Sequence, residues 1–434
     1  MKAIRIGICA LVAFAVLSFG CVQPWSQVVL EITSATLFLL WGILALRRQH
    51  AEIHWNWLYL PLLGLGALAV VLLAFGLSAY AYLTKIELLK WGAYVLLFFL
   101  AVEAFRTENQ LKQFAWFLVV FGFLVSLLAI FQYFTFNGKL YWFVPLTSGA
   151  RPFGPFVDSD HFAGFVELTV PWGLALLFFR SPRRDQLALL VLFAIVPIGA
   201  LVLSGSRGGI ISLFLEISLL VYLSRAHRVA RKEVLGTAVI ALVAGVFVLW
   251  LGVSETIQRF QQLAHTGITR DLRASMYHDS WRIFVDHRWV GTGLGTLIAV
   301  YPRYASFFNG VTVDHAHNDY LELLADTGLV GGFCGLAFVS LLFWQGFANI
   351  RFADGRFSRV IVAGSLVACA GMLIHSLVDF NLHIPSNALI FLLSASAATT
   401  EAREPQHKRC DLIATRGYPR SAVRLRDGEA AILT

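Results

Sequence analysis

Long apolar runs occupy most of the chain, and they restrict its fold more than any other feature. A helix crosses the hydrocarbon core of a bilayer with roughly 17–25 apolar residues. Because lipid offers the backbone no hydrogen-bonding partner, spanning segments of this kind must be helices. The sequence therefore predicts an all-α, polytopic transmembrane helix bundle of about 12 spans. The expected spans are residues 4–20, 27–46, 57–79, 88–105, 111–134, 161–180, 187–204, 208–224, 234–253, 329–347, 358–378 and 384–400.

Composition supports lipid as the solvent. Of the 434 residues, 58% are hydrophobic and 14% are charged, whereas soluble domains carry about 25% charged residues. The net charge of +8 comes from short basic clusters between the apolar runs. A nucleic-acid-binding protein gathers its basic residues into one stripe, so we expect membrane lipids and no nucleic acid as partners.

The N-terminus and the cysteines add little. Lys2 and Arg5 precede an apolar run to Gly20, as in a signal peptide. Since many spans follow, we expect a retained anchor. The five cysteines lack the spacing of metal ligands.

Lysine and arginine predict the orientation, because cytoplasmic connections carry an excess of both. With the N-terminus inside, basic residues fall in alternate connections and the short outer turns carry few. We expect residues 1–253 to hold spans 1–9, and residues 329–400 to hold spans 10–12. Residues 254–328 would form a large outer, periplasmic loop that contains short helices. Residues 401–434 would be a disordered basic cytoplasmic tail.

In this topology, the polar residues beside the membrane converge on the outer face. Chance would have divided them between the two faces. They are Arg151, Asp158, Asp160, His161, Arg207, Arg270, Arg273, Arg282, His315, His317, His375, Asp379 and His383.

Several of these residues have a plain structural alternative. Arg207 could snorkel to the interface, and Arg151 and Arg273 could be solvated loop residues. His375 is expected to be a core histidine hydrogen-bonded to Asp379, one helical turn later.

The segment 315–332 is the most informative. Asn318 or Asp319 can cap a helix with an apolar face of Leu321, Leu324 and Ala325, which ends at Gly328. The histidines before it, at positions i and i+2, suit a metal poorly because zinc sites on helices use wider spacing and further ligands. We expect one imidazole to act as a general base.

His317 is preferred to His315 as this base. Asn318 follows His317 directly and fixes its backbone, whereas His315 lies two residues earlier in the approach loop.

Five short motifs resemble the O-antigen ligase and polymerase family of bacterial membrane glycosyltransferases. They run from about residue 150 to 395 in the family's order. They are Arg151-Pro152-Phe153-Gly154 with His161 to Gly164, Ser206-Arg207-Gly208, Arg273 ahead of Trp281 and Gly291-Thr292-Gly293, His317-Asn318 with Gly328 and Gly331, and residues 375–385.

The resemblance implies an inverting, metal-independent enzyme without a cofactor. It would move a glycan from undecaprenyl diphosphate to lipid A-core or a growing polysaccharide, at the periplasmic face of the bacterial inner membrane. His317 matches the family's histidine and would be the base. Arg207, Arg273 and Arg151 would hold the diphosphate, because arginine offers a bidentate donor that stays charged. The supporting residues would be His315, Asn318, His161, His375 and Asp379.

Two alternatives stay open. One is a transporter or flippase of lipid-linked glycans, although the sequence shows no internal repeat and few mid-depth charges, as such a carrier would often need. The other, within the family, is a protein O-oligosaccharyltransferase. Those proteins often carry a further C-terminal domain, and the short basic tail departs from that pattern.

Overall fold

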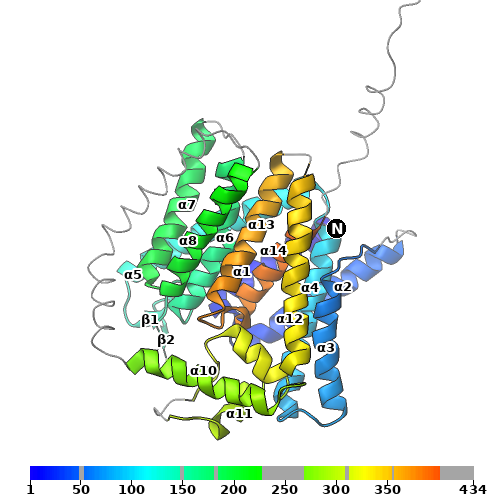
Figure 1. Ribbon diagram of the computed structural model, residues 1–434. Coiled ribbons are helices and arrows are strands. Elements are labelled where there is room, and N and C mark those ends of the chain that lie inside the picture. Colours follow the sequence, from blue (N-terminus) through cyan, green and yellow to red (C-terminus); the bar gives the residue numbers. More distant parts are fainter. Residues whose placement is uncertain are drawn as a thin grey trace, which may run out of the picture.

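The computed structural model describes residues 1–47, 53–146, 151–179, 184–226, 268–307, 312–353 and 356–400. Over these residues the protein is a bundle of long helices with one two-stranded sheet (Figure 1). Seven of the described helices are long and apolar enough to cross a membrane. The predicted all-α, polytopic bundle is therefore confirmed.

Each expected span has a helical counterpart, except residues 234–253, which lie outside the described residues. The bundle helices are α1 (Lys2–Leu17), α2 (Pro24–Arg47), α3 (Tyr59–Ala74), α4 (Ala81–Ala104), α5 (Glu108–Phe134), α6 (Ser159–Phe179), α7 (Arg184–Ser204), α8 (Arg207–Ala226), α12 (Asp319–Phe352), α13 (Arg356–His375) and α14 (Pro385–Thr399).

Helix α6 lies at the centre of the bundle. All but one of its residues are buried, and it packs against α5, α7, α8, α13 and α14. Its closest neighbour is α13, where Gly364 leaves room for the backbone of Trp172. Small residues allow such close helix approach in membranes. This packing sets the start of α6 beside the end of α13, where the candidate site lies.

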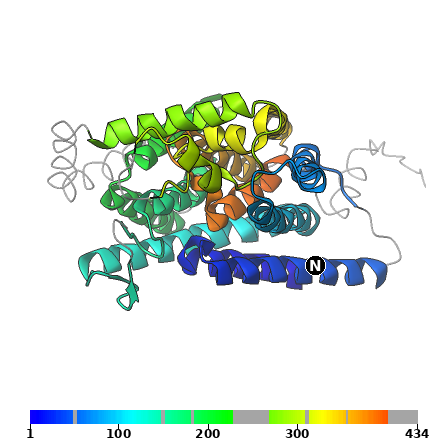
Figure 2. The same ribbon diagram turned by 90° about the horizontal axis from the view of Figure 1, so that it is seen from below.

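A layer of short elements lies beyond one end of the bundle. Helix α10 (Ile268–Asp286) runs across this end, with α11 (Leu297–Val300) next to it (Figures 1 and 2). The expected helix in the outer loop is thus present. Strands β1 (Lys139–Leu140) and β2 (Val144–Pro145) form a small antiparallel hairpin at the same end.

Helix α12 is broken where the sequence predicts an end. Gly328 has φ 61° and ψ −160°, a conformation that essentially only glycine adopts. A Cβ at this position would also lie 2.5 Å from the carbonyl carbon of Trp289. The backbone groups released by the break are satisfied, because the Leu329 N–H donates to the Arg288 carbonyl and the Val330 N–H to that of Trp289. The segment before Gly328 therefore stays at the end of the bundle, and the spanning part follows.

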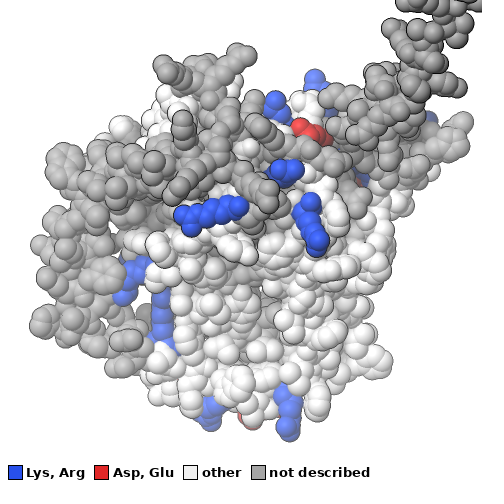
Figure 3. All heavy atoms as spheres, turned by 45° about the horizontal axis from the view of Figure 1, so that its top comes forward, with Lys and Arg blue, Asp and Glu red and all other residues white. Residues whose placement is uncertain are grey.

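The opposite end of the bundle carries the short basic connections. Arg106 lies between α4 and α5, Lys112 lies in the first turns of α5, and Arg351 lies in the last turn of α12. Figure 3 shows Lys and Arg side chains around this end. The sequence predicts that this end faces the cytoplasm.

Candidate active site

A histidine and a carboxylate form the centre of the site. His317 Nδ1 lies 3.1 Å from Asp379 Oδ1. The carboxylate is buried and also accepts the Phe380 N–H. Burial alone would raise the pKa of Asp379, but the His317 hydrogen bond and the nearby imidazoles hold it below its usual range. Because an ionised carboxylate only accepts, Nδ1 carries the proton.

The other ring nitrogen of His317 is available for chemistry. Nε2 has no hydrogen-bond partner among the described residues, and the side chain is 30% exposed. Nε2 therefore presents a lone pair to solvent, while Asp379 fixes the ring and can stabilise an imidazolium. This is the geometry of a histidine that works as a general base.

The backbone at His317 is held in an unusual conformation. Its φ is +51°, in the left-handed region that residues other than glycine seldom adopt. The Tyr277 hydroxyl of α10 donates to the His317 carbonyl at 2.9 Å. The Asn318 carboxamide oxygen caps α12, as predicted, by accepting the N–H groups of Tyr320 and Leu321. These contacts set the direction of the imidazole, and strain of this kind gathers at functional sites.

Asn318 also joins the start of α12 to the turn after α13. Its amide group donates to the Leu377 carbonyl at 2.9 Å. The Asp319 N–H donates to the carbonyls of Ser376 and Asp379. The two halves of the His317–Asp379 pair, 62 positions apart, are thereby locked together.

Two of the predicted arginines meet at one carboxylate. Arg273 Nη2 lies 3.7 Å from Asp160 Oδ2, and Arg151 Nη2 lies 3.5 Å from the same oxygen. Arg273 also donates to the Val378 carbonyl, beside the base's carboxylate partner. The guanidinium groups are partly exposed, so an anion can reach them from solvent.

The third predicted arginine, Arg207, lies at the start of α8 and is exposed. A Cβ on Gly208 would lie 2.5 Å from His375 Nε2 and 3.1 Å from the Val378 side chain. The Ser-Arg-Gly turn thus packs directly on the turn after α13, on the same side as Arg273.

One predicted pairing is wrong. His375 was expected to bond Asp379, but its Nδ1 lies 2.9 Å from Glu167 Oε1, and both side chains are buried. Asp379 is already engaged by His317, and α6 brings Glu167 alongside α13. His375 is the buried, satisfied histidine that was predicted, with a different partner.

Phe380, which the sequence did not single out, contacts three of the predicted histidines. Phe380 stacks on His315, with ring centroids 4.2 Å apart, and meets the edges of His161 and His317 at 4.8 Å and 4.9 Å. The fourth predicted histidine, His375, is the last residue of α13. Residues 377–380 thus contact His161, Arg273, His315, His317 and Asn318. Arg151 meets Arg273 at Asp160, and Arg207 lies next to Gly208, which packs on His375.

The first turns of α12 hold acids that sequence reasoning missed. Glu322 lies 2.7 Å from His315 Nδ1, and Asp319 lies 2.6 Å from His383 Nδ1. Both are buried, as is Asp326, which accepts the Gly295 N–H. Of the apolar face that was predicted, only Ala325 is buried. The spacing of the acids at i, i+3 and i+7 was the signal, since it puts them on one helix face.

The described residues include two groups that could hold a metal ion. They are His315, Glu322 and His383, and Asp160, His375 and Asp379. In the first, burial would lower the pKa of His383, but Glu322 and Asp319 raise it to about 10. A metal ion would have to displace the proton from this ring. The carboxylates therefore already serve as partners of the histidines.

These elements define a polytopic α-helical membrane protein with a His–Asp pair and several arginines at one end of the bundle. Residues 189–336 match the family model described as O-antigen ligase. The match confirms the resemblance of the chain to the O-antigen ligase/polymerase family. It includes Arg207, Arg273 and His317, whereas Arg151 and Asp379 lie outside it. A comparison with curated proteins finds no match.

Proposed function

We propose that the protein is an inverting glycosyltransferase that moves a glycan from undecaprenyl diphosphate to an acceptor hydroxyl, without a metal ion, at the periplasmic face of the inner membrane. The observation that carries this proposal is the His317–Asp379 pair set beside Arg273. A base that faces solvent and a cation next to it are what this displacement requires.

The base has a defined task. His317 Nε2 would take the proton of the acceptor hydroxyl as the oxygen attacks the anomeric carbon. Asp379, bonded to Nδ1, would stabilise the imidazolium that forms. Attack from the face opposite the leaving group inverts the configuration at that carbon.

The leaving group is a diphosphate, whose charge grows as the glycosidic bond breaks. Arg273 contacts the turn after α13, and Gly208, next to Arg207, packs on the same turn. Arg151 shares Asp160 with Arg273. A bound diphosphate would compete with Asp160 for these guanidinium groups. Arginine suits this task because its planar fork binds phosphate oxygens in pairs.

The polyprenyl chain of the donor needs an apolar cleft. A cavity of about 390 Å³ lies between α3, α4, α12 and α14, and Asp319 and His383 form its end near the site. Most of its wall is apolar, including Leu65, Trp91 and Phe338. A lipid tail in this cavity would leave its diphosphate close to the candidate site.

The rival function is a carrier of lipid-linked glycans. Buried charge does exist within the bundle, since neither carboxylate oxygen of Glu216 has a partner among the described residues. We favour the transferase because Nε2 of His317 faces solvent beside Arg273, at one end of the bundle, whereas a carrier would need its polar site near mid-depth.

Reconstitution separates the two functions. Purified protein in liposomes would receive an undecaprenyl-diphosphate-linked glycan and either lipid A-core or free polysaccharide as the acceptor. A new glycosidic product that His317→Ala protein does not form supports the transferase. Attachment to lipid A-core indicates a ligase, and longer glycan a polymerase. Movement of the glycan across the bilayer without product would overturn the proposal.

A further inference from the structure

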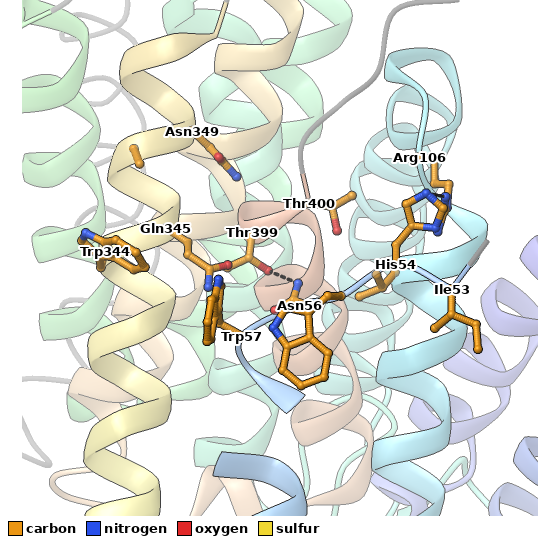
Figure 4. Close-up of a pocket in the computed structure, with 13 residues that line it drawn as sticks. Ile53, His54, Asn56, Trp57, Arg106, Trp344, Gln345, Asn349, Thr399 and Thr400 are labelled. Carbon is orange, nitrogen blue, oxygen red and sulfur yellow. Dashed lines mark hydrogen bonds between the residues drawn. The ribbon is translucent and has the colours of Figure 1, made fainter. Parts of the chain in front are cut away.

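A cavity of about 740 Å³ lies at the end of the bundle opposite to the candidate active site. It is lined by residues 53–57, by the ends of α4 and α14 and by the last turns of α12 (Figure 4). Helix α14 has 15 residues and so measures roughly 22 Å. That is less than the ~30 Å hydrocarbon core of a bilayer. The cavity, called the α14 recess below, lies beyond the end of α14, where this helix is too short to reach the far side of the hydrocarbon core.

Three indoles line the α14 recess. Trp55, Trp57 and Trp344 are each half exposed or more. Trp55 and Trp57 meet edge to face, with centroids 6.1 Å apart. Tryptophan gathers where head groups meet the hydrocarbon of a bilayer. The α14 recess therefore opens at the depth of lipid head groups.

The polar wall offers hydrogen bonds that no described residue takes. Asn56 and Asn349 donate to Thr399 Oγ1 and the Ala398 carbonyl, both at 2.9 Å, so these amides are satisfied. By contrast, Gln345 Nε2 is buried and has no partner in the part of the chain that the structure describes, and the same is true of Thr400 Oγ1. A buried amide donor left unpaired is costly, so these groups favour a ligand with acceptor oxygens.

A guanidinium group completes the wall. Arg106 donates to Glu103 Oε2 at 2.8 Å and contacts the His54 ring. Glu103 also accepts the His54 N–H. The cation is thus held in place at the rim.

We propose that the α14 recess binds the phosphodiester head group of a membrane phospholipid. Phosphate oxygens would accept from Gln345 Nε2, Arg106 would attract the head group from the opposite side of the cavity, and the indoles would contact the glycerol and the first acyl carbons. The volume exceeds that of a free phosphate ion, and the indoles suit an amphiphile. Basic pockets between helices at a cytoplasmic surface bind lipid head groups in this way. The inference is independent of the transfer reaction, because it concerns the other end of the bundle.

Native mass spectrometry of the purified full-length protein tests this site. Phosphatidylglycerol and phosphatidylethanolamine would be titrated separately, with inorganic phosphate as the probe for an ion-only site. We expect the first phospholipid molecule to bind more tightly than those that follow. Gln345→Leu should weaken this first binding step about tenfold. Trp344→Leu should weaken it as well. Inorganic phosphate should not compete.

Trp289→Leu is the matched control. This indole is as exposed as Trp344, but its backbone carbonyl accepts the Val330 N–H at the break in α12, near the other end of the bundle. It should keep the first lipid. Equal lipid binding by the wild-type, Gln345→Leu and Trp344→Leu proteins would overturn the proposal. Competition by inorganic phosphate would assign the cavity to a free anion and would also overturn it. Melting temperatures of the three variants in detergent would show that each protein is folded.

Discussion

At the scale of single residues, two histidines of the site are built alike and yet differ in their surroundings. His315 and His317 each present Nδ1 to a buried carboxylate, and their side chains are similarly exposed. His315 lies flat on Phe380, whereas His317 meets the edge of that ring. Only His317 has its carboxylate partner next to the residue that Arg273 contacts. The reacting atoms are therefore expected at His317.

Removal of the base should slow turnover strongly but leave donor binding intact. A general base contributes about 10²–10⁴-fold, so His317→Ala should lower kcat by that order. The Kd for undecaprenyl diphosphate should be unchanged. His315→Ala should cost much less. A larger loss of kcat for His315→Ala would show that His315 is the base, and equal losses would point to a coupled pair.

The arginines should act on binding as well as on turnover. Arg273→Lys keeps the charge but loses the planar fork, so activity should fall by about an order of magnitude at normal expression. Arg207→Ala should weaken binding of undecaprenyl diphosphate, measured with the purified protein in detergent. Unchanged affinity would assign Arg207 to the topology of the α7–α8 turn instead.

At the scale of elements, the turns at the site end of the bundle are joined by charged pairs. Asp319 at the start of α12 accepts from the Leu382 N–H and lies 2.6 Å from His383 Nδ1. Glu322, one turn later, faces the second nitrogen of the same ring at 3.3 Å. The start of α12 is thereby fastened to the connection between α13 and α14.

This fastening predicts a pH dependence of stability. The pKa of His383 is raised from 6.5 to about 10 in the folded protein, so folding favours the protonated ring. The stabilisation is complete below about pH 6.5 and is lost as the pH rises towards 10. His383→Gln should therefore flatten the fall of Tm between pH 7 and 10, measured in detergent by intrinsic fluorescence. An unchanged slope would show that His383 is not the titrating group.

Metal removal tests the same elements. His315 comes from the loop before α12, Glu322 from α12 and His383 from the turn before α14. Because these side chains already pair with one another, activity should survive dialysis against EDTA. Activity that disappears with EDTA and returns with a divalent ion would make these residues ligands.

At the scale of the whole molecule, hydropathy was enough to predict the bundle. Runs of apolar residues predict helices wherever lipid is the solvent, and the glycine at position 328 predicts the break in α12. The prediction that the nine site residues lie at one end of the bundle followed from topology alone. The partner of His375 did not, because hydrogen bonding across the bundle depends on how α6 packs on α13. Glu167 and Phe380 became site neighbours only through that packing.

The side of the membrane on which the site faces is the last prediction. Lys139 is an exposed residue of β1, at the end that carries the His317–Asp379 pair, and Asn109 is exposed in the first turn of α5, at the other end. If basic connections stay inside, Lys139→Cys should react in intact spheroplasts with a maleimide that cannot cross the membrane. Asn109→Cys should react only after the membrane is opened. The native cysteines would be replaced by serine or alanine first, and the cysteine-free protein gives the background. Labelling of Asn109→Cys in intact cells, with Lys139→Cys protected, would place the candidate active site in the cytoplasm, where a periplasmic transfer could not occur.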